Sequence, residues 1–156
     1  MLEPEVSTKA IRADDLATVS ALGIASKASW GYSAEEMAVF EPELTLSEAT
    51  LAELLAAEVA LVAGEIVGYY TLREHGDGAV ELEHLFVAEG MFHRGIGSAL
   101  LRSALGRARA HGVTRLMIIA DPNSAGFYER HGATKIGDHR SSIPGRSIPI
   151  YELPVG

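Results

Sequence analysis

Two glycines one residue apart, Gly95 and Gly97, stand directly before an amphipathic stretch in the segment GMFHRGIGSALLRSAL at 90–105. Glycine is a poor helix former, so the pair indicates that the backbone here is either unusually bent or closely approached. The first amides of a helix have no partner within it and carry partial positive charge. The spacing therefore favours an anion site for phosphate, although a tight strand-to-helix connection would also explain the glycines.

The donors of such a phosphate site would be consecutive main-chain amides, with a charged contact from Arg94 and a hydroxyl from Ser98. These amides belong to His93, Arg94, Gly95, Ile96, Gly97 and Ser98. Two common phosphate motifs do not fit. The dinucleotide fingerprint needs a third glycine where Leu100 stands, and the Walker loop needs a Gly-Lys-Ser/Thr tripeptide that the chain lacks.

Composition limits the other kinds of chemistry. The chain has 156 residues, 47% of them hydrophobic and 22% charged, and is expected to form a single domain over 1–156. It contains no cysteine, which excludes disulfides, thiolate metal sites and a cysteine nucleophile. His, Asp and Glu do not cluster with the spacing of metal ligands, so no metal is predicted.

Charge and hydropathy limit the partners. The net charge of −8 disfavours nucleic-acid binding and mildly favours small cationic partners, although excess acid also simply keeps a protein soluble. No apolar run approaches the roughly 20 residues that span a bilayer, and Met1–Ala10 lacks the plan of a secretion signal. No membrane contact is predicted, and a cytoplasmic location is expected.

Hydrophobic periodicity predicts the elements that would position the glycines. Ser33 and Glu36 form a capping box, and Gly112 is a plausible helix stop. Turns are expected at Gly64-Glu65 and at 75–78. Strands are predicted at 6–13, 59–63, 66–74, 79–87, 115–120 and on both sides of a loop at 140–146. Helices are predicted at 14–29, from Ser33 to about Phe40, at 47–57, from Ile96 to Gly112 and within 121–132. This order indicates an α/β domain with a mixed sheet.

Two strands carry predictions about their faces. The apolar run 115–120 is typical of a strand covered on both sides. Alternation along 80–87 puts four side chains on one face and His84 on the other, where it is expected to be structural. The four are Glu81, Glu83, Leu85 and Val87.

Taken together, LFVAEGMFHRGIGSALL (85–101), RLMIIADPNSAGFYERHGA (115–133) and the order of elements resemble the GCN5-related N-acetyltransferases, the GNAT family. The resemblance is clearest over 59–137. It implies a mixed, mostly antiparallel sheet of about six to seven strands flanked by helices. It also implies that acetyl-CoA is the co-substrate, with its pyrophosphate at the amides before and within the glycine pair.

Two positions depart from the family pattern. Phe92 occupies a slot that usually holds Gln or Arg, and Asp121 occupies the slot of an Asn, with Asn123 close by. Either Asp121 or Asn123 would meet the pantetheine arm. The resemblance further implies that the arm pairs like an added strand with the end of the third strand, against Leu85, Phe86 and Val87.

The chemistry implied is direct transfer of the acetyl group to an amine. Tyr128 matches the tyrosine that protonates the leaving thiolate in this family, and packing beside Phe127 is its alternative role. Glu81 or Glu83 would take the amine proton, with Glu81 slightly favoured, or both would be solvated acids. A bulge, frequent in this strand of the family, would change which way they point.

The acceptor is predicted to be a small-molecule amine of unidentified structure. Trp30 and Tyr32, with Phe40, would form its pocket through cation–π contacts or would simply pack in the core. Arg140, Arg146 and the serines between them would touch an acidic acceptor, the CoA 3′-phosphate or only solvent. The family often dimerises, which leaves a homodimer open. The alternative function is a non-catalytic acyl-CoA sensor or scaffold.

Overall fold

A single seven-stranded sheet organises the computed structural model, which describes residues 5–156. Its order is β1-β2-β3-β4-β5-β7-β6, and every neighbouring pair is antiparallel except β4 and β5. The strands are β1 (Ser7–Ala10), β2 (Ala56–Val62), β3 (Glu65–Glu74), β4 (Val80–Val87), β5 (Arg115–Ile119), β6 (Thr134–Arg140) and β7 (Ser147–Pro154). The predicted mixed, mostly antiparallel sheet is confirmed.

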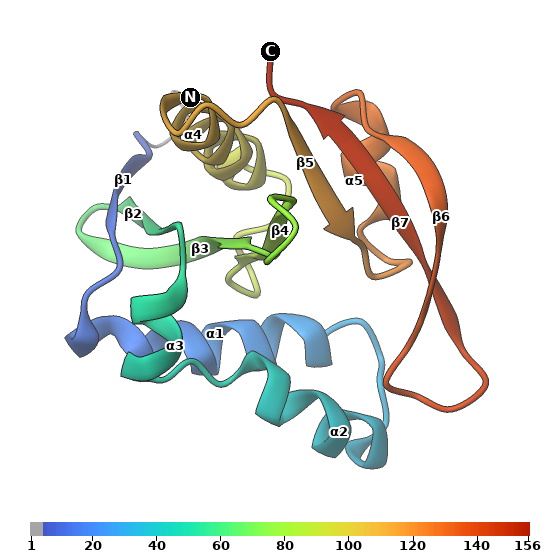
Figure 1. Cartoon of the computed structure of the whole chain (residues 1–156). Helices are drawn as coiled ribbons and strands as arrows, with labels where there is room; N and C mark the ends of the chain where they lie inside the picture. Colours follow the sequence, from blue (N-terminus) through green and yellow to red (C-terminus); the bar gives the residue numbers. More distant parts are fainter. Residues whose placement is uncertain (1–4) are drawn as a thin grey trace.

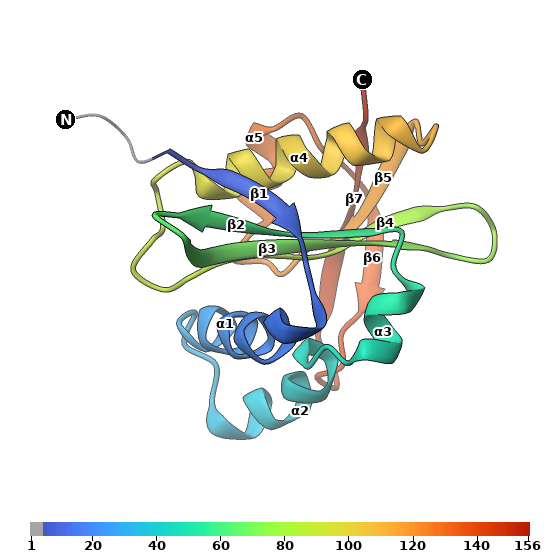
Figure 2. The same ribbon diagram turned by 90° about the vertical axis from the view of Figure 1, so that its left-hand side faces the viewer.

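Helices cover both faces of this sheet. Helix α4 lies against one face, and α1, α2 and α3 lie against the other (Figures 1 and 2). The helical segments are η1 (Ala13–Asp15), α1 (Leu16–Ala28), α2 (Ala34–Leu44), α3 (Glu48–Glu53), α4 (Ile96–Ala110) and α5 (Ala125–Arg130). No helix in residues 5–156 is long and apolar enough to cross a membrane.

Several predicted boundaries need correction. The capping box of Ser33 and Glu36 is present, but α2 continues past Phe40 to Leu44. Helix α3 ends at Glu53, because the following residues pair with β3 as the start of β2. The turn predicted at Gly64-Glu65 lies one residue earlier, since both Ala63 and Gly64 have left-handed backbone and β3 begins at Glu65.

A bulge in β4 overturns the predicted pattern of its faces. Thr71 of β3 pairs with His84 and Leu72 pairs with Leu82, so Glu83 is the extra residue. Side chains on opposite sides of a bulge change phase. Val80 and Leu82 before it, and Leu85 and Val87 after it, therefore all pack with the core on the α4 side. Glu81 and Glu83 do not share the face of Leu85 and Val87.

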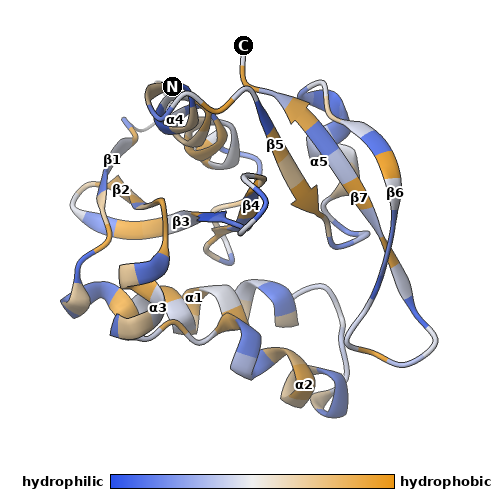
Figure 3. Ribbon diagram, in the orientation of Figure 1, coloured by the Kyte–Doolittle hydropathy of each residue, from blue (hydrophilic) through white to orange (hydrophobic). Residues whose placement is uncertain are grey.

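Strand β5 is covered less completely than its apolar run suggested, although it is coloured hydrophobic over most of its length (Figure 3). Leu116 and Ile118 are fully buried in the α4-side core. Met117 and Ile119, which point the other way, are only half-buried. Ile119 borders a cavity on that side of the sheet.

A buried carboxylate fastens α4 to the sheet. Glu58 of β2 accepts hydrogen bonds from the Tyr70 hydroxyl, from Ser103 Oγ at 2.6 Å and from Arg107 Nη2 at 3.5 Å. Burial by itself would raise the pKa of Glu58, but the bonds from Ser103, Tyr70 and Arg107 outweigh it and hold the pKa below its usual value. The position of α4, and so of its N-terminus, is set by this contact together with apolar packing.

Candidate active site

Two cavities open on the two sides of the end of β4. The first, named here the α4 cavity, has a volume of about 980 Å³. It is bordered by β4, the 88–95 loop, the start of α4, the end of α1 and α5. Its lining includes Leu85, Phe86, Val87, Phe92, His93, Gly95, Ile96, Gly97, Ser98, Asn123, Phe127, Arg130 and His131.

The second, named here the charged cavity, has a volume of about 410 Å³. Ionisable side chains on its border come from β4, from α1 and α2, from the end of β5 and from the β6–β7 segment. They are Lys27, Glu43, Glu81, Glu83, His84, Asp121, His139 and Arg146. Both cavities share Trp30, Leu85, Phe86, Ser124 and Tyr128 on their borders, so they meet.

The two cavities meet where the sheet comes apart. β4 and β5 pair only through Val80 with Leu116 and Glu81 with Met117. Beyond Glu81, β4 keeps its bonds to β3 but has no partner on its β5 side in the described pairing. The main chain of 85–87 therefore presents an open strand edge on the border of the α4 cavity.

The glycine pair has structural reasons of its own. Gly95 caps α4 with a φ of 79°, in the left-handed region that favours glycine. A Cβ added to Gly97 would lie 3.2 Å from the ring of Phe127. His93, at a φ of 62°, is also left-handed, and such backbone is a component of the concave amide clusters that bind anions. The loop is both bent and closely packed, with its amides on the border of the α4 cavity.

The start of α4 also suits an anion electrostatically. Its first turn contains no acidic residue, and Arg107 and Arg109 lie in its last turn. The positive N-terminal end of the helix is therefore uncompensated by a side chain of its first turn, and the two arginines lie at its negative C-terminal end. Arg94, which precedes Gly95, does not border the cavity.

The hydroxyl of Ser98 is engaged within the protein. Nδ1 of His131 lies 2.8 Å from the carbonyl oxygen of Phe127, which only accepts, so the ring donates from Nδ1. In the neutral ring Nε2 is then an acceptor, and Ser98 Oγ, 3.0 Å away, donates to it. Ser98 would have to leave His131 to donate to a ligand.

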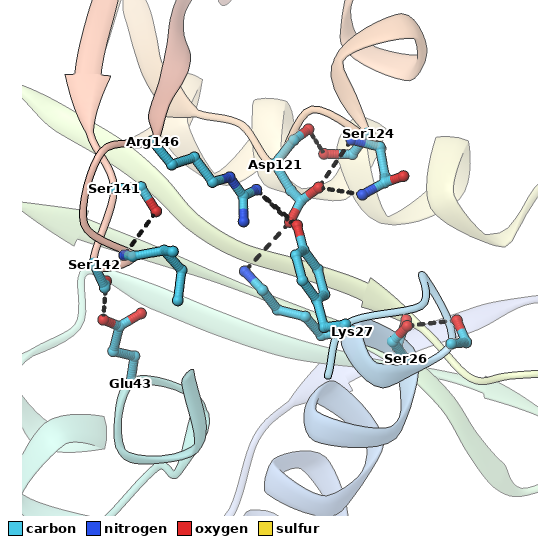
Figure 4. Close-up of polar contacts among 12 residues, drawn as sticks. Ser26, Lys27, Glu43, Asp121, Ser124, Ser141, Ser142 and Arg146 are labelled. Atoms are coloured by element: carbon cyan, nitrogen blue, oxygen red, sulfur yellow. Dashed lines mark hydrogen bonds and ion pairs between the residues drawn. The ribbon is translucent and has the colours of Figure 1, made fainter. Parts of the chain in front are cut away.

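Asp121 is the centre of a polar cluster (Figure 4). Its Oδ2 accepts from the Tyr32 hydroxyl at 2.6 Å and lies 3.4 Å from Lys27 Nζ and 3.6 Å from Arg146 Nη2. Its Oδ1 accepts from the backbone and the side-chain amide of Asn123, both at 2.8 Å. Asp121 borders the charged cavity, and Asn123 borders the α4 cavity.

The two glutamates of β4 both border the charged cavity but have different partners. Glu83 Oε2 accepts from Arg73 Nε at 2.5 Å, and this bond raises the pKa of the arginine. Glu81 Oε1 lies 2.8 Å from Nε2 of His75. The Glu81 side chain is 11% exposed and that of His75 is 39% exposed, so His75 connects a buried carboxylate to solvent.

His84 borders the same cavity as the two glutamates, which corrects its prediction on the opposite face. Its Nδ1 lies 3.0 Å from the Thr71 hydroxyl, and its ring also hydrogen-bonds the backbone of Glu43. Burial lowers the pKa of His84, which keeps the ring neutral. With both contacts made, its role here is to hold β3, β4 and α2 together.

The three aromatic residues predicted to form the acceptor pocket do not lie together around one pocket. Trp30 borders both cavities and lies 6.3 Å from the Phe86 ring. Tyr32 packs edge-on against Phe40 at 5.0 Å and uses its hydroxyl in the Asp121 cluster. The face of Phe40 is already covered by Lys27, whose Nζ lies 4.0 Å from the ring centroid.

Tyr128 is 5% exposed and borders both cavities. Burial raises its pKa well above the ordinary value, so the phenol stays protonated at physiological pH. Its ring packs edge-on against that of Phe127, with the ring centroids 5.2 Å apart. Tyr128 therefore both packs in the core and borders the cavities.

Sequence reasoning missed several residues on the two borders. Lys27 carries a weak signal, since it lies in the last turn of α1 only three residues before Trp30. Glu43 and His139 carry none, because nothing in their own segments marks a cavity. Arg130 and His131 follow Tyr128 so closely in the sequence that a position on the same cavity border could have been predicted for them.

Comparison with known proteins identifies the family pattern. Residues 23–133 match the model of the acetyltransferase (GNAT) family. A GCN5-related N-acetyltransferase from Rhodopseudomonas palustris is 21% identical, with 99% of this chain and 98% of that chain covered and a TM-score of 0.80. PaiA N-acetyltransferase from Thermoplasma acidophilum, solved with coenzyme A, is 19% identical, with 96% and 99% covered and a TM-score of 0.78.

A GNAT acetyltransferase from Brucella melitensis, solved with acetyl-CoA, is also similar. It is 19% identical over 97% of this chain and 89% of that chain, with a TM-score of 0.65. At these identities the likeness to the three structures shows the shared fold, and the family match over 23–133 shows the relationship.

We expect Asp121→Ala to lower the free energy of unfolding by roughly 2–4 kcal/mol at neutral pH, because Lys27 and Arg146 lose their counter-charge. Asp138→Ala, which breaks the exposed pair with Lys135, is the matched control and should cost less than about 1 kcal/mol. Urea unfolding of both variants measures the difference. Equal losses would contradict the role of Asp121.

The effect of Asp121→Ala should depend on pH. Burial alone would raise the pKa of Asp121, but hydrogen bonds from Tyr32 and Asn123 and the charge of Lys27 outweigh it and lower the pKa. The stabilisation is therefore complete above the unfolded-state pKa of about 3.9 and is lost as pH falls through the lower folded-state value. The gap between wild type and variant should narrow on acidification.

Proposed function

This chain belongs to the acetyltransferase (GNAT) family, and from that premise we propose that it moves the acetyl group of acetyl-CoA to a primary amine of a small molecule by direct transfer in a ternary complex. The observation that carries the proposal is the meeting of two cavities at Tyr128, beside the open edge of β4. One cavity has the amides suited to a phosphate group, and the other has carboxylates suited to an amine. Reacting groups brought together at such a junction need little further catalysis beyond orientation.

The α4 cavity fits acetyl-CoA. Its volume lies at the upper end of the roughly 300–1,000 Å³ range of ligand pockets. The amides of Ile96, Gly97 and Ser98 would hold the pyrophosphate, and the main chain at 85–87 would hold the pantetheine arm. PaiA from Thermoplasma acidophilum, solved with coenzyme A, shares this fold and supports the assignment.

The departures from the family pattern are compatible with this site. Phe92 borders the α4 cavity with its side chain partly exposed, so its apolar ring would contact the bound ligand, while the main-chain amides would supply the polar contacts. Asn123 borders the same cavity and is the better candidate for the pantetheine arm. Asp121 is committed to the charged cluster and serves the acceptor side.

Acid and base lie on different sides of the junction. Glu81 takes a proton from the amine and passes it to His75, which exchanges it with solvent. The amine nitrogen attacks the thioester carbonyl, the carbon–sulfur bond breaks, and Tyr128 gives its phenolic proton to the thiolate. Glu83 is the weaker candidate base, because its carboxylate is held by Arg73.

The function is tested by incubating the purified protein with acetyl-CoA and a broad panel of small amines while free thiol is measured. We expect thiol release that requires both the protein and an amine. Tight acetyl-CoA binding with no thiol release for any amine would favour the alternative of a non-catalytic acyl-CoA sensor or scaffold.

We expect Tyr128→Phe to lower turnover by roughly 10²-fold while the dissociation constant of acetyl-CoA changes little, because only proton donation is removed. Tyr151→Phe is the matched control, since Tyr151 lies in the same core and its hydroxyl contacts Glu129 rather than a cavity. Steady-state rates and calorimetric titration give the two quantities. Unchanged turnover in Tyr128→Phe would remove the phenol from the mechanism.

Replacing the candidate bases by the isosteric amide separates their roles. Glu81→Gln should lower turnover by about 10²-fold and flatten the acidic limb of the pH–rate profile at saturating amine, since the group that must be deprotonated is gone. Glu83→Gln should keep that limb. The opposite pattern would assign the base to Glu83.

A further inference from the structure

We propose that the acceptor carries a carboxylate as well as its amine, and that Arg146 and Lys27 bind this carboxylate in the charged cavity. The inference rests on the proposed function and narrows its substrate to the class of amino acids and related aminocarboxylates. It also assigns a ligand to the 140–146 loop, for which the sequence left an acidic acceptor, the CoA 3′-phosphate and solvent as alternatives.

The first observation is a pair of cations that share one carboxylate as their ion-pair partner. Lys27 and Arg146 lie 3.4 and 3.6 Å from the same oxygen of Asp121, which is their only ion-pair partner within residues 5–156. Their side chains are 15% and 23% exposed, so solvent screens them incompletely. Glu43 is a second carboxylate on this side of the cavity, but it accepts from Ser142 and forms no ion pair with either cation, so Lys27 and Arg146 share Asp121.

The second observation is an arginine with free donors. Arg146 Nη2 donates to the Tyr32 hydroxyl at 2.7 Å, and the guanidinium lies 5.1 Å from the Tyr32 ring centroid. No other hydrogen bond of this guanidinium is formed within the described chain, although it carries five N–H groups. A planar fork of this kind matches the two oxygens of a carboxylate.

The fork is held in place before any ligand arrives. Tyr32 accepts from Arg146 and donates to Asp121, which fixes the phenol between the two charges. The 140–146 loop is tied to α2 by the hydroxyl of Ser142, which donates to Glu43. An arginine positioned by such contacts loses little conformational freedom on binding.

The third observation is that the opposite charge lines β4. Glu81 and Glu83 border the same cavity and suit the amine of the acceptor, whereas the aromatic face of Phe40 is taken by the protein's own Lys27. A second cationic group on the acceptor would be repelled by Lys27 and Arg146. The volume of about 410 Å³ suits a molecule of amino-acid size.

The experiment compares matched acceptors that differ only in the carboxylate. For several side chains, the L-amino acid, its carboxamide and its decarboxylated amine are assayed for kcat/KM by thiol release with acetyl-CoA. We expect the best amino acid to exceed its carboxamide and its amine by about 10-fold or more, the range for a charged hydrogen-bonded contact.

Variants assign this preference to the two cations. Arg146→Gln should reduce the ratio between amino acid and carboxamide towards one, and Arg146→Lys should leave an intermediate ratio, because it keeps the charge but not the fork. Lys27→Met should also weaken the preference. Arg140→Gln is the matched control, since Arg140 ends β6 next to this loop but does not border the cavity. Acetyl-CoA affinity should be the same in all four.

The outcomes separate this inference from the proposed function. Turnover of decarboxylated amines equal to or better than that of the amino acids overturns the inference and leaves the acetyltransferase activity standing. If no amine is turned over, the proposed function fails. The carboxylate site is then tested directly by calorimetry, which compares the dissociation constants of N-acetyl amino acids and of their amides in the presence of coenzyme A. Equal binding of acid and amide, or a preference unchanged by Arg146→Gln, rejects it.

Discussion

The parting of β4 from β5 is the constraint on which the rest of the site depends. The two strands are joined only at Val80–Leu116 and Glu81–Met117, while β4 stays paired with β3 and β5 with β7. In a continuous sheet the main-chain groups of 85–87 would be paired and the two faces would be separated. Because the strands part, the cavities on the two faces of the sheet are connected, and Tyr128 lies where they meet.

The bulge at Glu83 connects this opening with the charges around it. A bulge increases the local twist of its strand, which is consistent with β4 turning away from β5 just beyond Glu81. The same bulge leaves Glu81 and Glu83 on the border of the charged cavity while Leu85 and Val87 remain in the core. One irregular residue thereby separates the ionisable part of the strand from its apolar part.

Most ionisable side chains of the charged cavity are paired with other ionisable side chains rather than exposed to solvent. Glu83 is matched to Arg73 and Glu81 to His75 along β3, whereas Lys27 and Arg146 gather around Asp121. Burial is tolerated because each ionised group has a partner. The cavity has carboxylates along β4, and its two cations, Lys27 and Arg146, lie together near the 140–146 loop. This separation is the basis for inferring an acceptor with both an amine and a carboxylate.

The sequence by itself determined the elements and most of their order. Periodicity located α4, the residues Ser33 and Glu36 marked the start of α2, and Gly95 and Gly97 marked the loop at the α4 cavity. These features could be predicted because capping, turn conformation and helical period depend on residues only a few positions apart. The likeness of 85–101 and 115–133 to one family then indicated the fold.

Only the tertiary structure decided how the acceptor side is assembled. Tyr32 and Arg146 are 114 positions apart and come together because β7 lies between β5 and β6 in the sheet. Alternation could assign β4 side chains to faces but could not reveal the extra residue at Glu83, since a bulge is defined by pairing with β3. Local periodicity records which side of an element is apolar, whereas the partners of a charged side chain depend on which distant strands become neighbours.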